Sequence, residues 1–67
     1  MTVGEKLRAA RERQRLSQSQ VAGLLGVAQP TVHAWETGRA APRARRLREV
    51  ARVYGLEPED LLPAEAA

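Results

Sequence analysis

The chain has 67 residues, enough for one domain, with no cysteine and a single histidine, His33. These counts exclude disulfides, thiolate metal sites and histidine-rich metal sites, and no apolar run approaches the ~20 residues that span a bilayer. Because the chain has no cysteine, no such run and no signal-peptide-like stretch at its start, we expect a soluble protein of a reducing compartment. Eleven Lys and Arg against eight Asp and Glu give a net charge of +3.

Two capping boxes mark the first two helices. The motif T-V-G-E near the start of the chain predicts a helix over residues 3–14, and S-Q-S-Q predicts a second over 18–25. Leu7 and Ala10 share a face of the first helix. Gly26 suits the left-handed residue that ends the second. Both segments are therefore expected to be short amphipathic helices.

Three further helices are expected between the remaining glycines and prolines. A helix over 29–37 has Pro30 in its first turn, where the missing N–H is not needed. The other two are expected over 42–54, which ends at Gly55, and over 58–62, which opens on a proline. Strand alternation is absent, so five short helices with tight connections predict an all-α domain.

The spacing of three small or branched residues predicts a helix-turn-helix. Ala22 lets two helices approach, Gly26 takes the left-handed turn between them, and Val32 fills the gap behind the turn. Each feature alone is a weak signal, but their combination at these offsets is specific.

A family resemblance covers nearly the whole chain. It runs from about Leu7 to Leu62 and rests on the segments LRAARERQRLSQSQVAGLLGVAQPTVHAWETGRAAP and LREVARVYGLEPEDLL. These segments resemble the lambda-repressor/Cro-type helix-turn-helix domains of the XRE family. The resemblance implies a five-helix, lambda-repressor-like domain that binds operator DNA as a two-fold dimer. It also implies a small transcriptional repressor, bacterial or phage-encoded, that works in the cytoplasm.

The resemblance gives two glutamines linked roles. Gln18 and Gln29 open the second and third helices; in the family, the first holds a phosphate and can brace the second, which reads a base. A glutamine amide has both a donor and an acceptor, so it can bind N6 and N7 of adenine together. The expected base-reading residues are Gln29, Pro30, Thr31, His33 and Ala34.

Some of these positions depart from the common family pattern. Pro30 and Ala34 have no hydrogen-bonding side-chain group and are limited to apolar contacts, such as a thymine methyl. His33 can donate to a phosphate or a base edge, or is an exposed histidine of no special role. The two glutamines have a similar alternative as solvated first-turn residues. Base readout is therefore expected to rest on few side chains.

The resemblance also implies a structural ion pair. Arg11 is expected to hold the carboxylate of Glu36 bidentately, partly buried, and so to aim the reading helix. Backbone N–H groups at the start of the 42–54 helix favour an anion. Most arginines of that helix are expected to be solvated, and Trp35 and Tyr54 to lie in the core. The expected phosphate-binding residues are Gln18, Thr37, Arg39 and Arg43.

The charge distribution favours a polyanionic partner. Residues 1–56 hold all eleven basic groups and four acids, whereas 57–67 hold four acids and no base. A basic body is typical of a nucleic-acid-binding face, although a solvated surface without a partner has the same composition. We predict double-stranded DNA with a palindromic or pseudo-palindromic operator as the partner. No enzyme activity, metal or cofactor is predicted, because no Gly-rich phosphate loop or paired-carboxylate pocket is visible.

One alternative uses the same fold. The chain could be a protein-interaction module or an antitoxin-type partner protein, but Arg39 and Arg43 beside the reading face favour DNA. A weak homodimer is expected, because one domain of this size leaves a small interface. The candidate dimer contacts are Leu56, Leu62, Pro63 and the segment from Tyr54 to Leu61.

Overall fold

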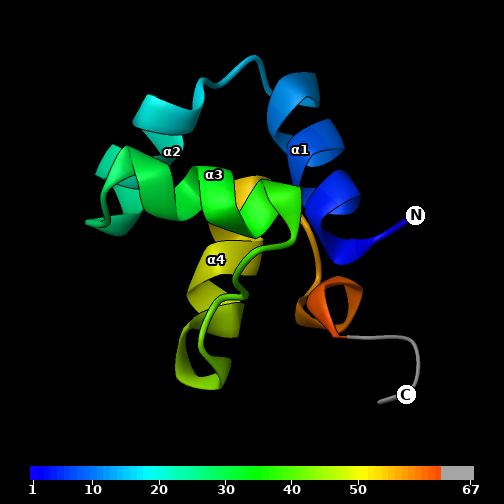
Figure 1. Cartoon of the computed structure of the whole chain (residues 1–67). Helices are drawn as coiled ribbons and strands as arrows, with labels where there is room; N and C mark the ends of the chain where they lie inside the picture. Colours follow the sequence, from blue (N-terminus) through cyan, green and yellow to red (C-terminus); the bar gives the residue numbers. More distant parts are fainter. Residues whose placement is uncertain (63–67) are drawn as a thin grey trace.

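A computed structural model describes residues 1–62 of the chain, and these residues form helices and turns without any strand (Figure 1). None of the helices in this part of the chain has the length and apolar character needed to cross a membrane. In chain order, the elements are α1 (Val3–Arg13), α2 (Gln18–Leu25), α3 (Gln29–Thr37), the 3-10 turn η1 (Ala44–Arg46), α4 (Leu47–Tyr54) and the 3-10 turn η2 (Pro58–Leu61).

Side chains define where α1 and α2 begin. The Thr2 hydroxyl accepts from the Glu5 N–H at 3.1 Å, and the Thr2 N–H donates to the Glu5 carboxylate at 2.8 Å. Ser17 and Gln20 make the same reciprocal pair at 3.0 and 2.7 Å. Each box satisfies two backbone donors that no helical carbonyl can reach. Helices α2 and α3 span the same residues as the sequence predicts, and α1 ends one residue earlier.

The expectation of five α-helices is wrong in its count, since 1–62 hold four. Within 42–54, Arg43 is extended and the first turn is 3-10, so the α-helix begins only at Leu47. No Ser, Thr, Asp or Asn stands in 39–46 to cap a longer helix. In place of a helix over 58–62 there is one 3-10 turn. Leu62 is extended because it precedes a proline, which disfavours the α conformation.

A glycine ends each of α2, α3 and α4 in the left-handed conformation. At the end of α2, Gly26 has φ of 69°, and the next N–H, from Val27, donates back to the Ala22 carbonyl at 3.0 Å. This backbone closure satisfies carbonyls that the helix leaves unpaired. It also turns the chain sharply into α3, which is the geometry of a helix-turn-helix.

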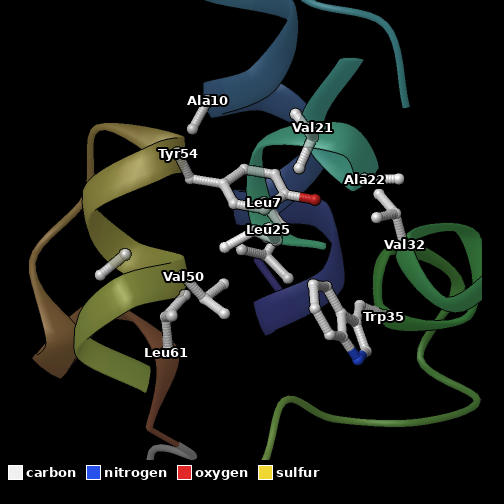
Figure 2. Close-up of a cluster of buried hydrophobic side chains, with 11 residues drawn as sticks. Leu7, Ala10, Val21, Ala22, Leu25, Val32, Trp35, Val50, Tyr54 and Leu61 are labelled. Atoms are coloured by element: carbon white, nitrogen blue, oxygen red, sulfur yellow. The ribbon is translucent and has the colours of Figure 1, made fainter. Parts of the chain in front are cut away.

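The core lies where the four α-helices meet, and each contributes side chains that exclude water (Figure 2). Trp35 and Tyr54 are both buried in it, so neither ring is available to stack on a base. The buried apolar residues are Leu7, Ala10, Val21, Ala22, Leu25, Val32, Trp35, Val50, Ala51, Tyr54 and Leu61.

Gly4 brings α1 into backbone contact with α3. A Cβ added at Gly4 would lie 2.6 Å from the Glu36 carbonyl oxygen and 2.9 Å from that of Trp35. Any side chain there would separate the two helices. In Figure 1, α1 accordingly lies beside the C-terminal end of α3, while α2 lies near the other end. The orientation of α3 is therefore fixed at both ends.

Candidate nucleic-acid interface

Helix α3 turns one face into the core and the other outward. Val32 and Trp35 are buried, whereas Gln29, Pro30 and His33 are exposed. The outward face also holds Thr31 and Ala34, which are half-buried, and Thr37, which is exposed. All five residues expected to read bases thus have some accessible surface on this one helix.

A buried carboxylate links all four α-helices. Glu36 of α3 has a side chain only 2% exposed, and Arg11 of α1 holds it bidentately, with Nε to Oε2 and Nη2 to Oε1 both at 2.8 Å. Gln18 of α2 donates its amide N–H to Oε1 at 3.1 Å. The Tyr54 hydroxyl of α4 donates to Oε2 at 2.8 Å. Each carboxylate oxygen therefore accepts two hydrogen bonds.

These donors keep Glu36 ionised inside the protein. Burial raises the pKa of Glu36. The hydrogen bonds from Arg11, Gln18 and Tyr54, together with the Arg11 charge, lower it by more than burial raises it, so the pKa lies below its ordinary value. The hydrogen bond to Glu36 raises the pKa of Arg11. Burial, and then the hydrogen bond to Glu36, raises the pKa of the Tyr54 phenol, which therefore stays protonated and acts as a donor.

The two glutamines are joined in a defined order. A carboxylate can only accept, so Gln18 presents its Nε2 to Glu36 and its Oε1 to the outside. Gln29 donates its Nε2 to that oxygen at 2.6 Å. Gln29 is left with its own Oε1 and one N–H for another partner. This is one acceptor beside one donor, on the outward face of α3.

A polar hollow of about 250 Å³ lies next to these groups. Gln18, His33 and Thr37 line it, and so do Arg8 and the Arg11–Glu36 pair. The Thr37 hydroxyl faces its own helix and donates to the His33 carbonyl at 2.9 Å, so its proton is already used. The hollow thus combines an arginine, an amide and an imidazole on the same side as the α3 outward face.

A family model described as "Helix-turn-helix domain" matches residues 2–64. The chain belongs to this helix-turn-helix family. Comparison with the curated proteins gives no match. Helices α2 and α3, joined through Gly26, are the two helices of the motif, and the protein is an all-α helix-turn-helix DNA-binding domain.

In the helix-turn-helix domain, two of the expected phosphate ligands take no part in the hydrogen bonds that join Glu36, Gln18 and Gln29. Arg39 and Arg43 are exposed and make no side-chain hydrogen bond or ion pair within residues 1–62. Both follow α3 in the connection to α4. Arg43 precedes a three-residue 3-10 turn that leads into α4, so the helical segment begins at Ala44 and not at residue 42 as expected.

One arginine of the helix-turn-helix domain has a role that sequence reasoning missed. Most arginines of the 42–54 segment are expected to be solvated, but Nη2 of Arg46 donates to the Leu25 carbonyl at 2.6 Å and also to Glu49 at 2.9 Å. The guanidinium therefore caps the last turn of α2 from the start of α4. The only sequence signal is the Arg46–Glu49 spacing, which does not reveal the partner 21 residues away.

Proposed function

We propose that the chain is a sequence-specific transcriptional regulator, a small repressor of the lambda-repressor/Cro type, that reads the major groove of double-stranded DNA with α3. The supporting observation is the outward amide of Gln29, braced by Gln18 at 2.6 Å. An immobilised amide has lost its rotamer entropy before binding, so its hydrogen bonds to a base contribute more of their energy. A DNA regulator of this kind acts in the cytoplasm of a bacterium or in a phage-infected cell.

The proposed base partner of Gln29 is adenine. With one N–H held by Gln18, the amide has one acceptor and one donor free, which matches N6–H and N7 of adenine in the major groove. Guanine offers two acceptors there and would need both N–H groups of Gln29. Pro30 and Ala34 contribute apolar contacts, and Thr31 and His33 contribute polar ones, on neighbouring base pairs.

The proposed phosphate ligands surround this reading face. Gln18 lines the polar hollow, and so does Thr37, whose hydroxyl would exchange the His33 carbonyl for a phosphate oxygen as its acceptor. Arg39 and Arg43 follow the end of α3. Since each cation that displaces counterions adds ~0.9 to the salt slope, the two exposed arginines anchor the domain without reading sequence.

Two copies are proposed to bind a palindromic or pseudo-palindromic operator as a weak homodimer. Half-sites read by two such helices lie ~34 Å apart along the duplex. Of the candidate contacts, Leu62 is 42% exposed, and Leu56, two residues before η2, is half-buried. Pro63 lies outside the described residues. Two domains of this length can share only a small interface, so the proposed dimer needs DNA to bring the two copies together.

Selection of bound duplexes from a random pool tests this function. A repressor of the proposed type enriches one motif with two-fold symmetry, an adenine at the position read by Gln29, and half-sites one helical turn apart. Gln29→Ala provides the internal control, because its enriched motif should lose information at that one base pair. A pool that emerges without any enriched motif would refute sequence-specific binding.

An apolar groove favours the second candidate, a protein-interaction module or antitoxin-type partner. The groove has a volume of about 670 Å³ and is lined by Val3, Trp35, Leu47, Leu61 and Leu62 among others. Titration of random duplex at two salt concentrations separates the candidates. Binding to DNA weakens steeply with salt, whereas a protein-interaction module shows no comparable affinity for the duplex.

A further inference from the structure

Tyr54 is buried, but its polar end is part of the interface network. The residue is 1% exposed, and Figure 2 shows its ring crossing the core with the hydroxyl pointing away from α4. That hydroxyl donates to Glu36 Oε2 at 2.8 Å. From there the hydrogen bonds continue through Gln18 to the outward amide of Gln29. The ring belongs to the core, whereas the hydroxyl belongs to a path that reaches the surface.

We propose that Tyr54 is a positioning residue for base reading. Its hydroxyl fixes the Glu36 carboxylate, which sets the direction of the Gln18 amide and so decides which polar atoms Gln29 presents. The inference rests on the function proposed above and adds a residue of α4, outside the helix-turn-helix, to the determinants of specificity.

The four donors around Glu36 show why the hydroxyl matters. Arg11 takes one position on each oxygen. Gln18 takes the second position on Oε1, and Tyr54 takes the second on Oε2. Without the hydroxyl, Oε2 keeps one donor on a side chain that is only 2% exposed. The carboxylate then gains by turning toward its remaining donors, because an underpaired buried acceptor is costly. Gln18 is half-buried and bonded to the exposed Gln29, so it is the donor through which this movement reaches the surface.

The direction of the Gln18 amide has a consequence for base choice. While Nε2 faces Glu36, the outward Oε1 requires Gln29 to donate, and Gln29 retains one acceptor and one donor. If Gln18 released Glu36 and then turned its amide over, it would present N–H groups, Gln29 would accept from it, and both N–H groups of Gln29 would be free. Two donors fit N7 and O6 of guanine instead of N6–H and N7 of adenine.

Tyr54→Phe removes the hydroxyl and keeps the ring, which makes it the test variant. Val50→Ala is the matched control, because Val50 is fully buried on the same helix and outside the hydrogen-bonded path. The affinity of each protein is measured for the selected duplex and for one with guanine replacing adenine at the position read by Gln29. Circular dichroism sets a temperature at which all variants are folded.

Tyr54→Phe is expected to reduce the adenine-to-guanine affinity ratio by at least about threefold, the lower range of measured coupling through packed networks. Val50→Ala should keep the wild-type ratio even though it also loses stability. An unchanged ratio in Tyr54→Phe, or an equal fall in both variants, would overturn the proposal. If Gln29→Ala abolishes the wild-type preference but Tyr54→Phe retains it, the proposed function stands and the role of Tyr54 fails.

A measurement without DNA tests the role of Tyr54 independently of the proposed DNA-binding function. In the free protein, the side-chain N–H protons of Gln18 and Gln29 can be followed by ¹⁵N-resolved hydrogen exchange. We expect slow exchange at Gln18 in the wild type and in Val50→Ala, and exchange at least about threefold faster in Tyr54→Phe, by the same coupling range. Equal rates in the wild type and in Tyr54→Phe would show that the hydroxyl does not hold the Gln18 amide, whatever the DNA binding.

Discussion

Gly4 and Glu36 are packed so closely that a methyl group on Gly4 would lie 2.6 Å from the Glu36 carbonyl oxygen. The contact joins two backbones, so no side-chain rotation can relieve it. It places the first turn of α1 against the end of α3, directly beside the residue whose side chain binds Arg11. The helix that carries Gln29 is thus held in place by a residue with no side chain.

Gly4→Ala is expected to destabilise the domain, although alanine favours helices. Overpacking costs about 1–3 kcal/mol, which exceeds the gain in helix propensity of up to about 1 kcal/mol. Urea unfolding measures the net effect. Gly23→Ala is the matched control, because nothing lies within 4 Å of its added Cβ and only the propensity gain remains. A Gly4→Ala protein as stable as Gly23→Ala would show that α1 can move away from α3 freely.

Gln29→Ala is expected to weaken binding to the selected duplex by about 1–3 kcal/mol and to relax preference at one base pair. The reason is that the outward donor and acceptor of Gln29 are lost together. Fluorescence anisotropy with the selected and a random duplex measures both effects. An equal loss on the two duplexes would contradict a base-reading role.

Arg43→Ala is expected to weaken binding to all duplexes alike and to reduce the slope of log K against log salt by ~1. Arg43 is exposed and makes no ion pair within the described part of the chain, so its charge is free to meet a phosphate. Affinities at four or five salt concentrations give the slope. A slope equal to that of the wild type removes Arg43 from the phosphate ligands.

Arg46→Ala is expected to behave differently from Arg43→Ala. It removes the donor that caps the Leu25 carbonyl at 2.6 Å, and should lower the free energy of unfolding by about 1 kcal/mol. The salt slope of DNA binding should stay at the wild-type value, because this guanidinium is already occupied within the fold. Arg45→Ala, which removes an exposed arginine one residue earlier, is the control for stability. Loss of slope without loss of stability would mean that Arg46 faces DNA.

The stability of the domain is expected to fall in acid because of Glu36. The pKa of Glu36 is lower in the folded chain than its ordinary value of 4.5, so the unfolded chain binds the proton more readily. The stabilisation is complete above the ordinary pKa and is lost as the pH falls through the folded pKa. Urea midpoints of the wild type and of Glu36→Gln between pH 3 and 7 should converge toward the acid end. A constant gap between the two would show that Glu36 is not held ionised by its donors.

Glu36→Gln is preferred to Glu36→Ala for that experiment. Removing one partner of a buried ion pair costs about 3–5 kcal/mol, which is a large share of the stability of about 5–15 kcal/mol that domains possess. The amide keeps the shape of the carboxylate and one of its acceptors. Its folding can be verified by circular dichroism before any titration.

The sequence predicts the local part of this structure well. Ser17 and Gln20 set the start of α2, and Ala22, Gly26 and Val32 set the turn into α3, because each of these signals depends only on near neighbours. The sequence does not predict correctly the helix start expected at residue 42 or the helix end expected at residue 62. There the missing cap, and the constraint that a following proline places on Leu62, outweighed the apolar pattern.

The long-range contacts could not be predicted from the residues. The sequence places Tyr54 in the core by its apolar ring, and no pattern indicates that its hydroxyl reaches a carboxylate 18 residues away. Gly4 reads as part of a capping box, and its contact with Glu36 depends on how α1 crosses α3. Such contacts follow from the relative placement of helices, which periodicity does not specify.

The convergence of four helices on one carboxylate bears on how the domain opens. Any partial unfolding that detaches α1, α2 or α4 would remove a donor from Glu36 and leave its buried negative charge with fewer partners. Frayed intermediates of that kind are therefore disfavoured, and the helices should separate in a single cooperative event. Local unfolding of α3 then costs nearly as much free energy as global unfolding. The backbone amides of α3 should therefore exchange with solvent only as fast as the whole domain unfolds.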